Sequence, residues 1–178
     1  MGLVARFDPQ KDHRRFIAAA EIVARQHADV HFLLCGGDID AHNQDLARWI
    51  NETPVADHFH LLGVRDDVPR LTAALDLSIS SSAHGEGFSN IIAEAMACAV
   101  PCVVTEVGDS ALIVGNTGWS VPAENESALA DAISVALAEP MDAHRLRGEQ
   151  ARSRIIDNFS IDEIFAKYRA VYQRLRQA

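Results

Sequence analysis

Two cationic side chains near the start of the chain lie five residues apart. Arg6 and Lys11 follow a short apolar run at residues 3–5 and precede a stretch with helical periodicity. Such cations suit a diphosphate, because the free backbone N–H groups of a helix's first turn point at the same anion. The alternative is a solvated basic loop, since residues 13–15 (His-Arg-Arg) extend the run of basic side chains.

Two glutamates form a second candidate group. Glu86 lies between Gly85 and Gly87 in a loop after an apolar run, and Glu94 lies within a run of Ile, Ala and Met. The glycines allow a ligand to approach the backbone, and residues 88–90 would open a helix with unpaired N–H groups. A carboxylate among apolar residues needs hydrogen-bond partners, which polyol hydroxyls would supply. The alternative is that Glu86 begins the helix and Glu94 pairs with a backbone group or a cation.

The elements that must position these residues alternate along the chain. Strands are expected at residues 3–5, 30–35, 59–62, 77–80, 102–105 and 119–121, and helices at 13–26, 43–51, 68–75, 89–99, 126–138, 143–158 and 161–176. This alternation predicts an α/β, Rossmann-like doubly wound parallel sheet with helices on both faces and a helical C-terminal tail. Ligands of such sheets bind beyond the carboxyl ends of the strands, where the loops at residues 6–12 and 80–90 are expected.

Length and composition set broad limits. With 178 residues, 48% of them hydrophobic, the chain fits one folded domain over residues 1–178 and is not disordered. Its net charge of -9 argues against nucleic-acid binding but not against a small phosphate-bearing molecule. The three cysteines show neither a CxxC pair nor a histidine at ligand spacing, which favours a reducing, cytoplasmic location.

Two segments carry a family resemblance. VARFDPQKDH (residues 4–13) and EGFSNIIAEAMACAVPCVVTEVG (residues 86–108) resemble the C-terminal, donor-nucleotide-binding domain of retaining GT-B glycosyltransferases of family four. That family's pattern has an Arg and a Lys five apart, then two glutamates separated by seven residues and a small-residue helix that ends before Pro. The resemblance covers nearly the whole chain and implies one half of a GT-B fold that binds a UDP-sugar or GDP-sugar, as in polysaccharide biosynthesis.

The resemblance also implies roles for individual residues. Arg6 and Lys11 would hold the donor diphosphate and stabilise charge on the departing nucleotide. Glu86 would lie against the donor sugar, so that it forms the catalytic set with Arg6 and Lys11, and Glu94 would accept hydrogen bonds from the ribose. The nucleotide-sugar-binding set also includes the turn whose backbone contacts sugar and phosphate, and the loop that recognises the base: Gly87, Phe88, Ser89, Asn90 and Arg65.

We expect neither a metal nor a cofactor, since the resembled enzymes need no metal and the nucleotide sugar is itself the donor substrate. The Asp-Ile-Asp run at residues 38–40 lies between two glycines and a helix, where turn and cap chemistry is typical. His58 and His60 alternate along an expected strand without a third ligand, which favours a structural role. His84, beside the glutamate loop, is left open as a donor contact.

The chain departs from the family in three ways. Ala5 and Ala99 stand where Gly is common, and nothing matches the family's N-terminal domain, which holds the acceptor. We therefore expect this half to be inactive alone, and its parent could lie against the cytoplasmic face of a membrane. Two alternatives stay open: a non-catalytic nucleotide-sugar-binding or regulatory module of the same fold, and a fragment of a GT-B sugar-nucleotide epimerase.

Overall fold

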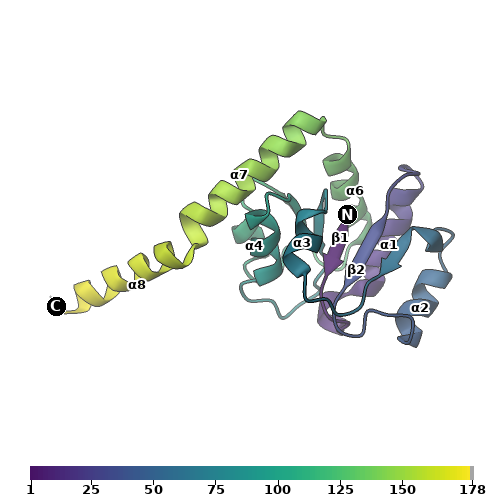
Figure 1. Cartoon of the computed structure of the whole chain (residues 1–178), viewed down its shortest axis with the longest axis horizontal. Helices are drawn as coiled ribbons and strands as arrows, with labels where there is room; N and C mark the ends of the chain where they lie inside the picture. The colour runs from purple at the N-terminus through teal and green to yellow at the C-terminus, as the bar shows by residue number, and fades with distance from the viewer. Residues whose placement is uncertain (177–178) are drawn as a thin grey trace.

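One parallel sheet of six strands forms the centre of the computed structural model, which describes residues 1–176 (Figure 1). The strands are β1 (Gly2–Val4), β2 (Phe32–Cys35), β3 (Phe59–Leu61), β4 (Ser78–Ser80), β5 (Cys102–Thr105) and β6 (Trp119–Val121). Their order across the sheet is β3-β2-β1-β4-β5-β6, so the direction of winding reverses between β1 and β4. This is the doubly wound, Rossmann-like order, and it confirms the predicted fold class.

Helices cover both faces of the sheet. On one face α1 (His13–Ala24), α2 (Gln44–Asn51) and α6 (Glu126–Leu137) bury their apolar sides against a shared core. On the other, α4 (Asn90–Ala97), α5 (Ser110–Val114) and α7 (Met141–Phe159) form a second core, with α3 (Val68–Ala73) beside α4. Strand β5 serves both cores, because Val103 faces the first while Cys102 and Val104 face the second.

Local signals explain where the first helix begins. A single 3-10 turn, η1 (Pro9–Lys11), leads from β1 into α1, and a second, η2 (Ala56–His58), precedes β3. Asp12 joins η1 to α1 in the left-handed conformation, with φ at 47°, and its carboxylate accepts a hydrogen bond from the backbone N–H of Arg15. Asp12 therefore caps α1, and this cap fixes the position of Lys11 one residue earlier.

The end of α4 keeps a glycine-like geometry with an alanine. Ala99 has φ at +60°, its N–H donates to the Met96 carbonyl, and the Val100 N–H donates to the Ala95 carbonyl at 3.0 Å. These two bonds form a Schellman motif, whose left-handed residue is usually Gly. The departure at position 99 thus leaves the turn closed, and the strain falls on the alanine backbone.

The C-terminal helix α8 (Ile161–Leu175) projects away from the sheet in Figure 1. An apolar stripe of this kind usually packs against a core, but α8 has no buried residue and contacts the rest of the described chain mainly through α7. The exposed apolar side chains are Ile161, Ile164, Phe165, Tyr168, Val171, Tyr172 and Leu175. Within residues 1–176 no helix is both long enough and apolar enough to cross a lipid bilayer.

Candidate functional site

The candidate site lies where the winding of the sheet reverses. The loop at residues 5–12 follows β1, the loop at residues 81–89 follows β4, and these two strands are neighbours. The Ala83 N–H donates to the Gln10 carbonyl at 2.8 Å and ties the loops together. Open parallel sheets bind their ligands at the carboxyl ends of the strands on either side of such a reversal.

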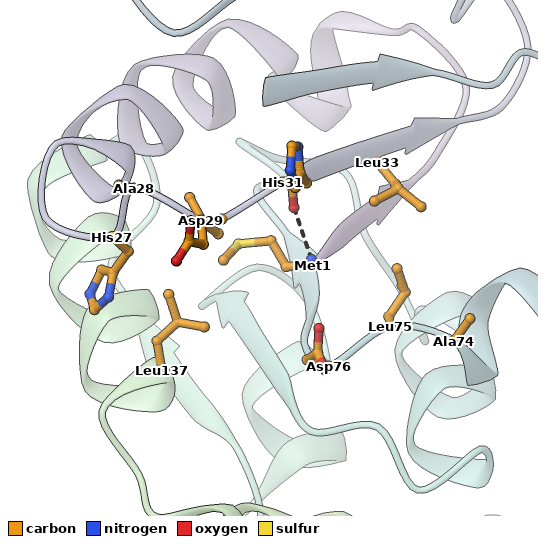
Figure 2. A pocket seen from close by; sticks show the side chains of 11 residues that line it. Met1, His27, Ala28, Asp29, His31, Leu33, Ala74, Leu75, Asp76 and Leu137 are labelled. Atoms are coloured by element: carbon orange, nitrogen blue, oxygen red, sulfur yellow. Dashed lines mark hydrogen bonds between the residues drawn. The ribbon is translucent and has the colours of Figure 1, made fainter. Parts of the chain in front are cut away.

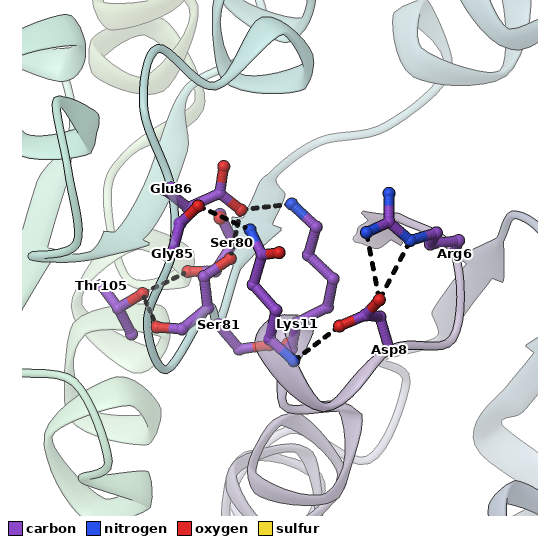
Figure 3. Close-up of polar contacts among 10 residues, drawn as sticks. Arg6, Asp8, Lys11, Ser80, Ser81, Gly85, Glu86 and Thr105 are labelled. Carbon is purple, nitrogen blue, oxygen red and sulfur yellow. Dashed lines mark hydrogen bonds and ion pairs between the residues drawn. The ribbon is translucent and has the colours of Figure 1, made fainter.

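Lys11 and Glu86, from separate sequence motifs, meet here as an ion pair (Figure 3). Their side chains are 18% and 7% exposed. The Ser82 hydroxyl donates to the same carboxylate oxygen, Oε1, at 2.7 Å. Burial acts to raise the pKa of Glu86, but the hydrogen bonds from Lys11 and Ser82 outweigh it and hold the pKa below its ordinary value. Glu86 is therefore ionised at neutral pH, and its Oε1 atom accepts two hydrogen bonds.

Neighbouring loops hold the Glu86 segment in place. The Gln10 side-chain amide donates to the Gly85 carbonyl at 3.1 Å. From the loop after β5, the Asp109 N–H donates to the Gly87 carbonyl at 3.2 Å. Gly108 lies so close that a Cβ there would meet the Glu86 carbonyl oxygen at 2.2 Å, and its φ of 56° also favours glycine. Gly108 was not predicted, although the sequence VGD after an apolar strand marks the turn.

A group of buried hydroxyls joins the ends of β4 and β5 to this site. Ser81 donates to the Lys11 carbonyl at 2.8 Å, and Thr105 donates to the Ser82 carbonyl at 2.7 Å (Figure 3). We call Ser81, Ser82 and Thr105 the hydroxyl network; all three are buried. None was predicted as a site residue, and the available signal was the unusual SISSS run at the end of an apolar strand.

Arg6 lies beside this pair but does not join it. Its side chain is 64% exposed and donates to the Asp8 carboxylate, with the closest contact at 3.0 Å (Figure 3). A hydrogen bond from the Gln10 backbone N–H, followed by those from Arg6, keeps the pKa of Asp8 below its ordinary value. The backbone of this loop is clamped by Gly36, where a Cβ would lie 2.2 Å from the Ala5 carbonyl oxygen.

The residues predicted for the turn before α4 are mostly exposed. Gly87, Phe88 and Asn90 are exposed, and Ser89 is buried at the N-cap of α4. Phe88 is 43% exposed, and its ring packs against the ring of Phe159 with 5.4 Å between the ring centroids.

Glu94 does not lie in the apolar surroundings that its neighbours in the sequence suggested. The side chain is exposed, and within residues 1–176 it makes no hydrogen bond or ion pair. The cause is helix geometry, because Ile92, Ala95 and Met96 point into the core from other sides of α4. Its carboxylate is therefore open to a ligand.

The loop predicted to recognise the base lies after β3. Arg65 is exposed and donates to both carboxylate oxygens of Asp67, at 2.7 and 2.8 Å. At residues 38–40, the Asp40 carboxylate accepts from the His42 N–H and the Asp38 carbonyl accepts from the Asn43 side chain, which confirms the predicted turn.

His58, at the end of η2, and His60, in β3, have structural contacts. His58 bonds the Val30 carbonyl, and His60 bonds the ring of His31 at 3.0 Å. Within residues 1–176 no group of three or more His, Cys, Asp or Glu side chains is arranged to hold a metal ion. His84 is exposed next to the glutamate loop.

A cavity of about 440 Å³ opens at the other end of the sheet, where the strands begin (Figure 2). It is bordered by Met1, whose amino group donates to the His31 carbonyl at 3.0 Å, and by Asp76, Leu75 and Leu137. None of the predicted site residues lines it, so it is separate from the Lys11–Glu86 site.

Comparison with known proteins places this geometry in context. Residues 1–139 match the family described as "Glycosyl transferases group 1". An N-acetyl-alpha-D-glucosaminyl L-malate synthase of Bacillus anthracis is 32% identical over 120 residues, which are 66% of this chain and 31% of that protein. The crystal structure of Anabaena Alr3699/HepE in complex with UDP and glucose superposes with a TM-score of 0.84 at 23% identity, over 97% of this chain and 47% of that one.

A second solved structure matches at domain size. The C-terminal domain of the glycosyl transferase group 1 family protein LpcC from Francisella tularensis superposes with a TM-score of 0.74 at 19% identity. The match covers 90% of this chain and 86% of that domain. The chain thus spans 31% and 47% of the longer proteins above, but most of an isolated C-terminal domain.

Proposed function

The chain belongs to the group 1 glycosyl transferases and has the Rossmann-like fold of the C-terminal half of a GT-B enzyme, and from that premise we propose that it binds a nucleotide-diphosphate sugar as the donor half of a retaining glycosyltransferase. The observation that carries the proposal is the meeting of Lys11 with Glu86 at the reversal of the sheet. A cation for the diphosphate and a carboxylate for the sugar lie side by side there, as a nucleotide sugar requires.

Each site residue has a chemical task in this proposal. Arg6 and Lys11 bind the diphosphate together with the free N–H groups at the start of α4, and they stabilise the negative charge that develops on the departing nucleotide. Glu86 accepts a hydrogen bond from the donor sugar, and the exposed Glu94 accepts from the ribose. Retention of the anomeric configuration is supported by the resemblance of the two sequence motifs and needs no metal ion in this scheme.

The acceptor belongs to another part of the enzyme in this proposal. The chain spans less than half of the longer relatives above, and a missing N-terminal domain would hold the acceptor. We expect transfer to require both halves, in the cytoplasm or at the cytoplasmic face of a membrane. Because the Anabaena protein carries UDP and glucose, a UDP-sugar is the first donor to test, followed by a GDP-sugar.

Calorimetric titration of this chain with UDP, GDP, UDP-glucose and GDP-mannose tests the proposal. Arg6→Ala should weaken binding about tenfold or more, since a charge-assisted hydrogen bond to phosphate is lost. Arg48→Ala is the matched control: Arg48 is similarly exposed and also paired with an aspartate, Asp45, but lies on α2. Failure of all four ligands to bind, or equal effects of the two substitutions, would refute the proposed donor site.

Product analysis on the enzyme with both halves distinguishes the remaining alternatives. A glycosyltransferase moves the sugar to an acceptor and releases the nucleoside diphosphate. An epimerase of the same fold changes the sugar nucleotide without an acceptor, and a binding module leaves it unchanged. The ionised Glu86 with its lysine partner is a complete polar site, which argues against a module that has lost its chemistry.

A further inference from the structure

The carboxylate of Glu86 has two distinguishable oxygens. Oε1 accepts hydrogen bonds from both Lys11 and Ser82, while Oε2 accepts none within residues 1–176. Ser82 is itself held, because its carbonyl accepts from the Thr105 hydroxyl at 2.7 Å and its side chain is buried. The Ser82 hydroxyl is therefore held in a fixed position just after the carboxyl end of β4, unlike the long and flexible Lys11 side chain.

The two partners of Oε1 respond differently to an anion at this site. Lys11 has three N–H donors and a full positive charge, so a diphosphate that contacts Lys11 shares its charge and weakens its hold on Glu86. Ser82 is neutral and buried, so a diphosphate does not compete with Glu86 for its hydroxyl group. Once a donor is bound, Ser82 is the partner that keeps Oε1 turned inward.

We propose that Ser82 is a positioning residue for Glu86, which fixes Oε1 against the sheet and presents Oε2 to a hydroxyl group of the donor sugar. This inference rests on the proposed function and adds to it a residue that orients the sugar rather than the nucleotide. Thr105 supports the same arrangement from β5 by holding the Ser82 backbone.

Few other groups of the described residues face the Glu86 carboxylate. The neutral Gln10 amide donates to the Gly85 carbonyl, and its proximity makes a small contribution to lowering the pKa of Glu86. The loop after β5 brings the backbone of Gly108 against the Glu86 carbonyl, while Glu106 of that loop accepts instead from the Ser120 hydroxyl. His84 is exposed in the same loop as Glu86. Among the described residues, Lys11 and Ser82 are therefore the hydrogen-bond partners of this carboxylate, and their removal should change the titration of Glu86 most.

The first experiment needs no donor. A pH titration of the Glu86 side-chain carboxyl by carbon NMR compares the chain with Ser82→Ala, Ser82→Thr and a control, Ser80→Ala. Ser80 is also buried but its hydroxyl makes no hydrogen bond to Glu86 in the described residues. We expect Ser82→Ala to raise the Glu86 pKa by about one pH unit, Ser82→Thr to restore it, and Ser80→Ala to leave it unchanged.

The second experiment separates sugar from nucleotide. Calorimetry measures, for each variant, the ratio of affinities for UDP-glucose and UDP, or for GDP-mannose and GDP if the guanine nucleotides bind instead. Ser82→Ala should leave the affinity for the nucleoside diphosphate within about twofold while the ratio falls at least fivefold, and Ser82→Thr should recover the ratio. A general loss of structure would instead lower both affinities and the urea midpoint.

An unchanged Glu86 pKa in Ser82→Ala, or an unchanged affinity ratio, overturns the proposal. If no nucleotide or nucleotide sugar binds the unaltered chain, the proposed function fails, and the sugar-positioning role fails with it. The NMR titration then still reports whether Ser82 controls the ionisation of Glu86, so the two failures are distinguishable.

Discussion

Gly108→Ala should destabilise the chain far more than Gly63→Ala, although both glycines have nearly the same backbone, with φ at 56° and 64°. At Gly63 no atom lies within 4 Å of an added Cβ, so the substitution costs only left-handed strain of about 1–2 kcal/mol, partly offset by the lower entropy of the unfolded chain. At Gly108 the Cβ would meet the Glu86 carbonyl oxygen at 2.2 Å and the Gly87 oxygen at 2.8 Å. Forced separation of packed atoms adds about 1–3 kcal/mol.

Urea unfolding of both variants measures these losses. We expect about 1 kcal/mol for Gly63→Ala, on the strain account, and about 2–4 kcal/mol for Gly108→Ala, when overpacking is added. Gly108→Ala should also shift the NMR signal of the Glu86 carboxyl, because the two loops must move apart. Equal losses in the two variants would show that the loop after β5 yields freely and does not hold the Glu86 segment in place.

Three further substitutions test other parts of the structure. Ala99→Gly should raise the free energy of unfolding in urea by about 0.5–1 kcal/mol, because it removes left-handed strain from the end of α4. Lys11→Met should raise the pKa of Glu86, which Lys11 helps to hold below its ordinary value. The variant should therefore have a lower free energy of unfolding than the unaltered chain at neutral pH, and this difference should shrink as the pH falls through the folded pKa of Glu86. Urea unfolding of both proteins at pH 7 and pH 3 measures it. Burial lowers the pKa of His13 from 6.5 to about 4, so the unfolded chain takes up a proton at this position before the folded chain does. The contribution of His13 to the free energy of unfolding should therefore fall by roughly 3 kcal/mol as the pH drops from 6.5 to 4. Thermal unfolding of His13→Leu should show a weaker dependence on pH over this range.

The central strands could be predicted from the sequence because they are buried on both faces, and β2 and β5 stand out as apolar runs. All six strands were expected, and β5 and β6 begin and end where expected, at residues 102–105 and 119–121. Helix α5 was not predicted, since its five residues are too few to show a helical period and Asp109 makes no side-chain cap bond. The exposure of α8 also depends on what it packs against, which an amphipathic pattern does not reveal.

The sequence marks Lys11 and Glu86 as candidate residues, but it does not reveal that they are in contact. Lys11 and Glu86 are 75 positions apart, and they meet only because β4 pairs with β1 rather than with β3. That strand order is a property of the whole sheet, so no local pattern contains it. Ser82 could not be predicted for a similar reason, because the hydrogen bond from its hydroxyl to Glu86 depends on how residues 82–86 turn after β4.

The charges of the site explain why the net charge of the chain says little about phosphate binding. Each of the three cations assigned to the donor, Arg6, Lys11 and Arg65, is paired with a carboxylate. The three cations and their three carboxylates therefore cancel one another before a ligand arrives. This local balance cannot be read from the net charge of -9, which sums over the whole chain. In the proposed function, a diphosphate would have to take a share of Arg6 and Lys11 from their carboxylates, which would lower its net gain in affinity. The same exchange would favour release, because Asp8 and Glu86 would regain their partners when the nucleoside diphosphate leaves.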